Sequence, residues 1–310
     1  MRNSLRKLAA LALTLGALVS LYALVVRPWF LSWGSTEAEQ TRVLPGDEIA
    51  PGARSTTRAV TIAASADEVW PWVAQLGQDR AGFYSYEILE DLAGGEMPRA
   101  TQIVPDAQGW RSGDSLWMYP PAKVDGFGSA PLLALVPGRA LAFGTWWAGS
   151  PHDRPPDGSW AFVIEPAGDE SARLLVRTRG TSAPSVLGRA FDRGFFEPAH
   201  FVMERRMMDG IRGLAEGRQA PSRASERAEV LTWVGMAVVF VWAVVAVFRR
   251  KRWAVPLAVT GATAIAFQIL TLAQPPALAG GVLLAVLAGS LLRGALPRRA
   301  RVPAALPVGG

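Results

Sequence analysis

The chain has 310 residues, no cysteine and a formal net charge of +6, and half of its residues are hydrophobic. The lack of cysteine excludes disulfides, thiolate metal sites and a cysteine nucleophile. All 26 acidic residues lie between Arg27 and Glu229, so the excess positive charge lies in flanking clusters beside apolar segments, which removes the main support for nucleic-acid binding.

The first predicted element is a transmembrane helix over residues 8–26, which follow a basic N-terminus of residues 1–7. The segment carries no charge and is long enough to cross a bilayer as a helix. A cleaved signal peptide is the alternative interpretation. We expect an uncleaved anchor because the apolar run is long and no small-x-small cleavage site precedes Arg27.

Residues 27–53 are predicted to form a linker with one short helix. Thr36 and Glu39 have the spacing of a capping box, which marks a helix N-terminus. The turn-forming sequence Leu44–Asp47 follows, and a soluble domain is expected over residues 54–218. A second linker is expected over residues 219–229.

The soluble domain is predicted to be α+β. A β-branched strand comes first, followed by a helix with Ser65 and Glu68 as its capping box and by a second short helix that ends before Gly94. A run of antiparallel strands and one long helix over residues 197–217 complete the domain. The predicted strands cover residues 56–63, 115–119, 132–136, 140–145, 159–165 and 173–179.

Three further uncharged apolar segments, at residues 230–248, 254–273 and 277–292, predict transmembrane helices, of which the last is the shortest. None of the four segments contains an ionisable residue, so we expect an anchor bundle rather than an ion path. Small residues recur every fourth position from Ala277 to Gly289, which predicts a close-packing helix face and a homo-oligomer formed through it.

The basic clusters predict the topology of the chain. They lie in residues 1–7, residues 249–252 and the tail of residues 293–310. With four spans all three clusters fall on one side of the membrane, and the positive-inside rule makes that side cytoplasmic. The sequence therefore predicts a multi-pass protein of the cytoplasmic (inner) membrane with an extracytoplasmic soluble domain.

Eight short segments resemble a bacterial membrane-associated group of the START-like, polyketide-cyclase and lipid-transport (SRPBCC) superfamily. They are Arg27–Phe30, Leu44–Glu48, Val69–Trp72, Gly82–Tyr86, Ile103–Pro105, Val136–Leu141, Ser159–Phe162 and Glu197–Arg205. The resemblance implies a helix-grip fold, in which a curved antiparallel sheet packs on a long C-terminal helix. It also implies a cavity between the sheet and that helix for an apolar small molecule or lipid, without covalent chemistry.

The expected ligand-binding residues are aromatic, imidazole and thioether side chains of the strands and helices. They are Trp72, Tyr84, Tyr86, Trp117, Trp146, Trp160, Phe196, His200, Met203 and Met207. Tyrosine rings with polar tips suit the mouth of such a site. Arg205 or Arg206 could pair with an acidic ligand head, although a solvated helix face is the ordinary role of such residues.

Two alternatives to a lipid-binding domain stay open. One is a cyclase-type or hydratase-type enzyme that uses His200, Glu197 and Tyr84 for proton transfer. The other is a membrane assembly module without a ligand. A metal site is not expected, because the chain has only two histidines, and His152, Asp153 and Asp157 lie in a proline-rich turn. No cofactor-binding or hydrolase motif is present, so no cofactor is expected.

Overall fold

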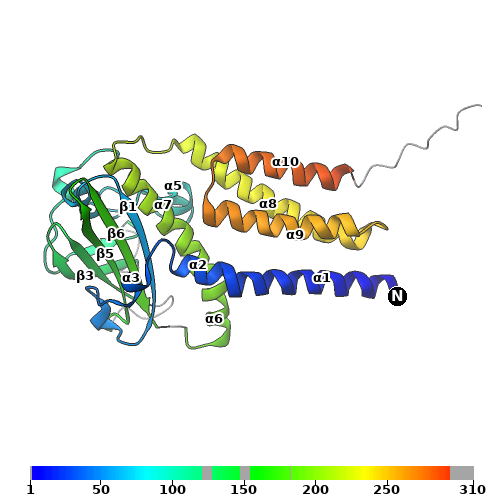
Figure 1. Cartoon of the computed structure of the whole chain (residues 1–310), viewed down its shortest axis with the longest axis horizontal. Coiled ribbons are helices and arrows are strands. Elements are labelled where there is room, and N and C mark those ends of the chain that lie inside the picture. The colour runs from blue at the N-terminus through cyan, green and yellow to red at the C-terminus, as the bar shows by residue number, and fades with distance from the viewer. Residues whose placement is uncertain (1, 121–127, 147–153, 182, 294–310) are drawn as a thin grey trace, which may run out of the picture. The chain divides into compact units, whose positions relative to one another are not determined.

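The computed structural model describes residues 2–120, 128–146, 154–181 and 183–293. The chain divides into two compact units. The first, Leu21–Arg227, contains the β-sheet, and the second joins Met1–Ser20 to Ala228–Gly310 and has helices as its described elements. Each unit is described by itself below (Figure 1).

Six antiparallel strands form one sheet in the order β1-β6-β5-β4-β3-β2. Their bounds are Arg54–Ile62, Ser115–Trp117, Ser129–Val136, Ala140–Thr145, Gly158–Gly168 and Ser171–Gly180 for β1 to β6. Strand β1 pairs with the distant β6 along its whole length, from Arg54 opposite Gly180 to Ile62 opposite Ala172. The β3–β4 turn contains Gly138 with a φ of +75°, which glycine adopts without steric cost. The sheet and its helices confirm the predicted α+β class.

Helices α4 and α7 cover one face of the sheet. Helix α4 is Ala66–Ala74, and Ser65 and Glu68 form the predicted capping box at its start. Helix α7 is Glu197–Ala215, with Pro198 in its first turn, where the missing N–H is harmless. Alternate residues of the strands face these helices and build one apolar core. The core includes Val60, Ile62, Phe143, Trp160, Phe162, Val176, Val69, Val73, Met207, Met208 and Ile211.

Shorter helical segments connect the elements of this unit. They are η1 Tyr22–Val26, α2 Arg27–Leu31, α3 Glu37–Thr41, η2 Asp47–Ile49, α5 Glu87–Leu92, η3 Pro105–Ala107, α6 Val186–Phe191 and η5 Asp192–Phe196. Helix α3 begins with the predicted capping box of Thr36 and Glu39. Segment η5 continues α6 directly into α7, so the chain stays helical from Val186 to Ala215.

The other face of the sheet is covered by the segment that contains α3 and η2. Arg177 projects into this layer and is fully buried. Its guanidinium donates hydrogen bonds of 2.6–3.0 Å to the carbonyls of Glu39, Gln40 and Arg42 and to the carboxylate of Asp47. Because a buried guanidinium is costly unless its donors are satisfied, these bonds hold the segment before β1 against the sheet.

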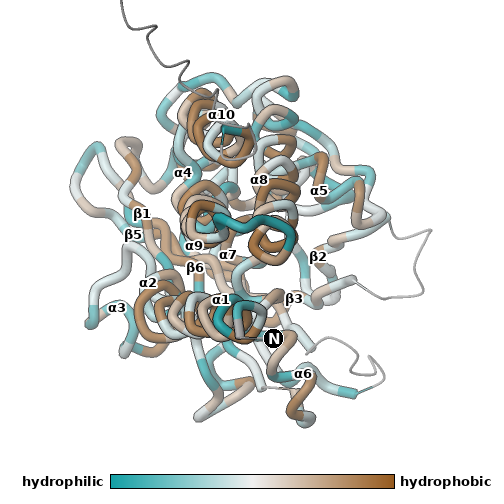
Figure 2. The backbone as a smooth tube through the Cα atoms, turned by 90° about the vertical axis from the view of Figure 1, so that its right-hand side faces the viewer, coloured by the Kyte–Doolittle hydropathy of each residue, from teal (hydrophilic) through white to brown (hydrophobic). Residues whose placement is uncertain are grey.

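The helical unit contains α1 Arg2–Leu21, α9 Ala254–Gln268, η6 Ile269–Ala273, α10 Ala277–Arg293 and most of α8 Arg223–Arg249. Over the described residues, three helices are long and apolar enough to cross a membrane, namely Asn3–Leu31, Arg223–Arg249 and Ala254–Ala273. Helix α10 is apolar but shorter than a membrane span requires, so the prediction of four transmembrane helices was wrong: three of the described helices are long enough. Figure 2 shows the hydrophobic colouring along α8, α9 and α10.

The basic residues of the helical unit gather at one of its ends. Lys7 Nζ donates to the carbonyl oxygens of Phe248 (3.0 Å) and Arg250 (2.9 Å). The Arg250 guanidinium donates to the carbonyl of Leu291 at 2.7 Å, two residues before Arg293. The helix ends that carry the basic residues at 2–7, 249–252 and 293 are therefore close together.

Candidate functional site

Helix α7 carries the most distinctive polar group of the domain, Glu204, on its buried face. Glu204 Oε1 accepts a hydrogen bond of 2.6 Å from the Arg58 guanidinium of β1, and both side chains are 1% exposed. Glu204 Oε2 accepts from Trp160 Nε1 at 2.9 Å, and Arg58 Nε donates to the carbonyl of Phe30 at 2.9 Å. The Phe201 ring packs on the guanidinium, 4.9 Å from Cζ.

This pair ties three distant parts of the sequence together: the end of the first apolar helix, β1 and α7. A buried ion pair of this kind is strongly destabilising to break, because one charge would be left uncompensated. No local pattern in the sequence predicts this ion pair. The available signal was Arg58 itself, a charged residue at an inward position of an alternating strand, where an apolar side chain is the rule.

His200 lies one turn before Glu204 and is partly buried, with 28% of its side chain exposed. Its Nε2 is 3.8 Å from Glu204 Oε2, its ring meets Trp160 edge-on at 5.9 Å, and it stacks on Phe196 at 5.9 Å. Burial lowers the pKa of His200, Glu204 opposes this shift, and Arg58 adds to it. The imidazole is therefore neutral at pH 7 and can act as a hydrogen-bond donor or acceptor.

Glu197, in the first turn of α7, is engaged by two arginines. Arg27 binds both carboxylate oxygens, at 2.7 and 2.9 Å, and Arg54 adds a third contact at 2.7 Å. A fork-to-fork pair of this type fixes both side chains. Glu197 therefore joins the first apolar helix and β1 to the start of α7.

Tyr84, which is not part of α7, packs against a different stretch of that helix. Its hydroxyl accepts a hydrogen bond of 2.7 Å from Gln75, and its ring meets Trp72 edge-on at 6.0 Å. The backbone has a φ of +56°, unusual for a bulky residue, and burial raises the pKa of its hydroxyl. It packs against Gly210, where a Cβ would lie only 2.5 Å from the Tyr84 carbonyl oxygen.

Gly210 is ten residues beyond His200, or about 15 Å along the helix. The described contacts therefore do not bring Tyr84 to His200 and Glu197, the group expected for proton transfer. His200 meets Trp160 and Phe196 instead.

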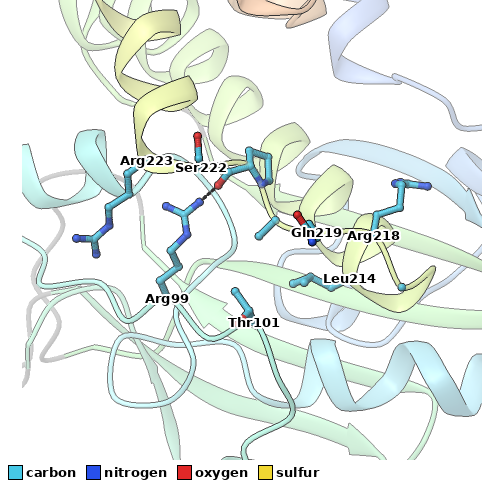
Figure 3. Close-up of a pocket in the computed structure, with 10 residues that line it drawn as sticks. Arg99, Thr101, Leu214, Arg218, Gln219, Ser222 and Arg223 are labelled. Atoms are coloured by element: carbon cyan, nitrogen blue, oxygen red, sulfur yellow. Dashed lines mark hydrogen bonds between the residues drawn. The ribbon is translucent and has the colours of Figure 1, made fainter.

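Two adjoining cavities lie beside the C-terminal half of α7. The smaller, of about 140 Å³, is lined by Tyr84, Ser85, Pro98, Ala100, Arg206, Asp209 and Gly213 among others. The larger is an open depression of about 460 Å³, and Figure 3 shows Arg99 and Arg223 on one side of it and Leu214 and Arg218 on the other. Both are lined by Arg99, Leu214, Arg218, Gln219, Ala220 and Pro221.

Arg99 is the central charged residue of these cavities. It forms ion pairs of 3.1 Å with Glu87 and with Glu226, and it donates to the Pro221 carbonyl. Glu87 also pairs with Arg223 at 3.0 Å. The larger cavity is lined by three arginines and by no acidic residue. No sequence pattern marks Arg99, Arg218 or Arg223 as cavity residues, because they lie in loops or at the very start of a helix, where no periodicity indicates an inward direction.

Glu90 lies near the same acidic residues. Burial and, to a smaller extent, the neighbouring carboxylates of Glu87, Asp91 and Glu226 together raise its pKa to about 8. One of its side-chain oxygens is buried without a hydrogen-bond partner among the described residues. A protonated Glu90 therefore fits this environment better than a charged one.

The other expected ligand-binding residues are distributed over the domain. Trp160 and Met207 belong to the packed core, where Trp160 stacks against Phe83 at 6.2 Å. Tyr86 is fully buried beneath the guanidinium of Arg206, at 4.7 Å. The Met203 carbonyl accepts a 2.7 Å bond from Ser85. Of the ten residues, only Tyr84 lines either of the two cavities described above.

The remaining expected residues lie at strand ends and turns. Trp117 is a partly buried residue of β2, and Trp146 follows β4 and donates to the Arg154 carbonyl at 3.0 Å. Asp157 pairs with Arg154 at 3.0 Å, whereas His152 and Asp153 lie outside the described residues. No group of three or more histidine, aspartate or glutamate side chains suited to a metal ion occurs within the described part of the chain.

Comparison with known proteins gives structural neighbours only. No family model matches the chain, and no curated protein matches its sequence. A norcoclaurine synthase from Thalictrum flavum, solved with dopamine and hydroxybenzaldehyde, aligns with 61% of this chain and 96% of its own at 13% identity and a TM-score of 0.31. An AHSA1-like protein from Rhizobium etli aligns with 56% of this chain and 88% of its own, at 16% identity and a TM-score of 0.29.

A polyketide cyclase-like protein from Corynebacterium glutamicum is similar over 54% of this chain and 87% of its own, at 16% identity and a TM-score of 0.25. At such low identities and TM-scores these neighbours carry no conclusion about activity or ligand.

Proposed function

We propose that the protein is a membrane-anchored domain of START-like type that binds a small amphipathic, lipid-like molecule beside α7 without covalent chemistry. The observation that carries this proposal is the pair of adjoining cavities of about 140 and 460 Å³. The larger falls in the size range of small-molecule sites. The smaller extends it with a recess against Tyr84 and Gly213.

The lining of the cavities favours a molecule with an apolar body and an acidic head. Tyr84 and Leu214, with nearby prolines and alanines, offer apolar surface in the smaller cavity. Arg99, Arg218 and Arg223 line the larger cavity without an acidic residue among its lining. A carboxylate or phosphate would compete with Glu87 for the guanidinium groups of Arg99 and Arg223 and form charge-assisted hydrogen bonds there.

The membrane part of the proposal rests on the apolar helices and on the positions of the basic residues. Three helices have the length and composition of membrane spans. The basic residues gather at one end of the helical unit, and the positive-inside rule assigns that end to the cytoplasm. In our proposal the protein lies in the cytoplasmic (inner) membrane, and the sheet-containing unit lies outside the cytoplasm.

Self-association through the helical unit is part of the proposal. Gly281 and Gly289 in α10 have no described heavy atom within 4 Å of an added Cβ. Small residues with such open space let two helices approach closely. A second copy of the chain is the partner we propose for this face.

The ligand-binding proposal is tested by filling the smaller cavity. Gly213 lines it, and a Cβ there would make only ordinary contacts of 3.7–3.8 Å with Arg218. We expect Gly213→Phe to fold normally and to occupy the space of about 140 Å³ with its ring. Gly109→Phe is the matched control, because Gly109 is exposed and nothing lies within 4 Å of its Cβ position.

The full chain and both variants are purified in detergent, washed and extracted with organic solvent, and the released molecules are quantified by mass spectrometry. We expect the same amphipathic acid from the unmodified chain and from Gly109→Phe, with at least a fivefold loss from Gly213→Phe. Equal recovery from all three proteins would place the retained molecule elsewhere and reject the proposed cavity.

A further inference from the structure

A strongly apolar surface lies on the helical segment that precedes α7. Leu187, Phe191 and Phe195 follow one another at intervals of four residues and therefore share one side of the helix. Leu187 is 83% exposed and Phe195 is 61% exposed, and the rings of Phe191 and Phe195 pack together at 5.2 Å. Val186 and Phe196 extend this surface at its two ends. We call Val186–Phe196 the apolar foot.

Exposed leucine and phenylalanine side chains in such a row need an apolar partner, because monomeric soluble domains rarely expose contiguous apolar patches. Among the described residues, the apolar side chains of the foot are exposed to solvent rather than covered by other parts of the unit. Ser185 caps the start of α6 by accepting from the Gly188 N–H, and Arg189 donates to the carbonyls of Ala183 and Pro184. The foot is thus an ordered helix with an uncovered apolar side.

The position of the foot is set by its contacts with the first apolar helix. The Tyr22 hydroxyl donates to the carbonyl of Arg193, and Arg27 binds Glu197 with both ends of its guanidinium. Tyr22 and Arg27 both belong to the Asn3–Leu31 helix, which is long and apolar enough to cross a membrane. All these residues lie in the same compact unit, Leu21–Arg227.

These contacts fix the depth of the foot relative to the bilayer. At about 1.5 Å per residue, a helix of 29 residues is about 44 Å long, whereas the apolar core of a bilayer is about 30 Å thick. Tyr22 lies nine residues, or about 13 Å, before the end of that helix. The uncharged run of this helix ends at Val26, four residues or about 6 Å beyond Tyr22, so the backbone of Arg193 is level with the helix just inside the boundary between lipid tails and headgroups.

We propose that the apolar foot lies in the lipid interface of the bilayer, with Leu187, Phe191 and Phe195 inserted among the acyl chains. An interfacial helix of this kind buries aromatic and aliphatic residues by about 5–10 Å and keeps basic residues near the headgroups. The exposed Arg193 supplies such a charge. This inference rests on the membrane anchoring in the proposed function, but it does not depend on the cavities beside α7.

The occupant we assign to the foot is the lipid of the same membrane, for two reasons on the molecule itself. The hydrogen bonds from Tyr22 to Arg193 and from Arg27 to Glu197 hold the foot directly against a helix that is long and apolar enough to span a membrane. Trp29, which is also exposed on that helix, adds an aromatic residue of the type that settles at bilayer interfaces.

The chain has no cysteine, so a single introduced cysteine reports one position without background. Leu187→Cys and Phe195→Cys test the foot, and both native side chains are exposed, so the changes leave the packed core intact. Val136→Cys is the control. Val136 is 46% exposed and pairs with Ala140, the first residue of β4. Thr145, the last residue of β4, pairs with Gly158, which in turn pairs with Gly180. Gly180 is the end of β6 from which the chain runs to α6, so Val136 and α6 belong to opposite ends of β4. The two ends of β4 are about 17 Å apart.

Each full-length variant is labelled with an environment-sensitive fluorophore and placed in nanodiscs of phosphatidylcholine and phosphatidylglycerol. A spin-labelled phosphatidylcholine, with the nitroxide near the start of the acyl chain, serves as the quencher. We expect the fluorescence at positions 187 and 195 to fall at least twofold with the quencher, and the fluorescence at 136 to change by less than a tenth.

Two results would overturn the inference while leaving the anchor in place. The first is unquenched fluorescence at 187 and 195 in a protein that resists extraction from membranes by carbonate. The second is efficient oxidative disulfide formation between two copies of Leu187→Cys in nanodiscs, which would identify a second copy as the cover of the foot. Release of the protein by carbonate would reject membrane anchoring itself, and with it the foot, but not the cavity proposal.

Discussion

Glu204 and Arg58 form an ion pair of 2.6 Å in which both side chains are 1% exposed. Trp160 and the Phe30 carbonyl complete their hydrogen bonds, so no charge in this cluster is left without a partner. The pair joins α7 to β1 and is buried, like the aromatic residues Trp160 and Phe201 that it contacts. It is therefore an internal tie of the domain, with His200 as its partly exposed neighbour.

Substituting one partner of this pair is expected to lower the free energy of unfolding more than substituting both. Glu204→Gln leaves the buried Arg58 charge uncompensated, which typically lowers the free energy of unfolding by about 3–5 kcal/mol. The double variant Arg58→Met/Glu204→Leu leaves no buried charge and should lose less. Thermal unfolding of the detergent-solubilised chain, followed by tryptophan fluorescence, ranks the three proteins. A double variant that melts below Glu204→Gln would contradict this account.

Glu90 should make stability depend on pH. Its folded-state pKa of about 8 lies above the ordinary carboxyl value of 4.5, so the folded chain binds more protons than the unfolded chain between these pH values. The contribution of Glu90 to the free energy of unfolding is therefore fully present below about pH 4.5 and is lost as the pH rises through 8.

We expect Glu90→Gln to raise the melting temperature at pH 9 and to leave it almost unchanged at pH 4.5. The free energy of unfolding at pH 9 should rise by on the order of a few kcal/mol, because each unit of pKa shift corresponds to about 1.4 kcal/mol. Glu170→Gln, at an exposed turn, is the control and should have no effect at either pH. Equal effects of Glu90→Gln at both pH values would show that Glu90 does not titrate as described.

The Phe196 ring should hold down the pKa of His200. Phe196 stacks on the imidazole at 5.9 Å, and burial is the main cause of the lowered pKa. Phe196→Ala exposes the ring to water and should raise the pKa toward its ordinary value. NMR titration is simple because the chain has only two histidines, and His152→Gln assigns the signals. An unchanged titration curve in Phe196→Ala would show that this ring does not control burial.

The proposed topology is tested by reporter fusions. Alkaline phosphatase fused after Gly217 should be active, since that site is expected outside the cytoplasm, and a fluorescent protein at the same site should be dark. Fusions after Arg252, within a basic cluster, should give the opposite result. Fluorescence without phosphatase activity after Gly217 would reverse the proposed orientation.

Local signals in the sequence predicted the α+β class, the capping boxes at Ser65 and Thr36, and the long last helix. These features depend on residues three or four positions apart, or on alternation along a strand, so they can be recognised without knowing the fold. The pairing of β1 with β6 depends on closing a long loop. No local pattern specifies it.

The candidate site was much harder to predict. Arg99 meets Glu226 across 127 residues, and Arg58 meets Glu204 across 146. Whether an arginine faces solvent, a core or a cavity depends on such contacts rather than on its neighbours in the sequence. Tryptophan and methionine were expected at a ligand site, but the same apolar character suits a packed core, which is where Trp160 and Met207 lie.

The central claim is that one amphipathic molecule occupies the cavities beside α7. Native mass spectrometry of the intact chain, released from detergent micelles, tests it most directly. The account predicts one adduct of a single mass per chain, present in the unmodified protein and in Gly109→Phe and absent in Gly213→Phe. A chain that appears only at its own mass, or an adduct of equal abundance in Gly213→Phe, would contradict the claim.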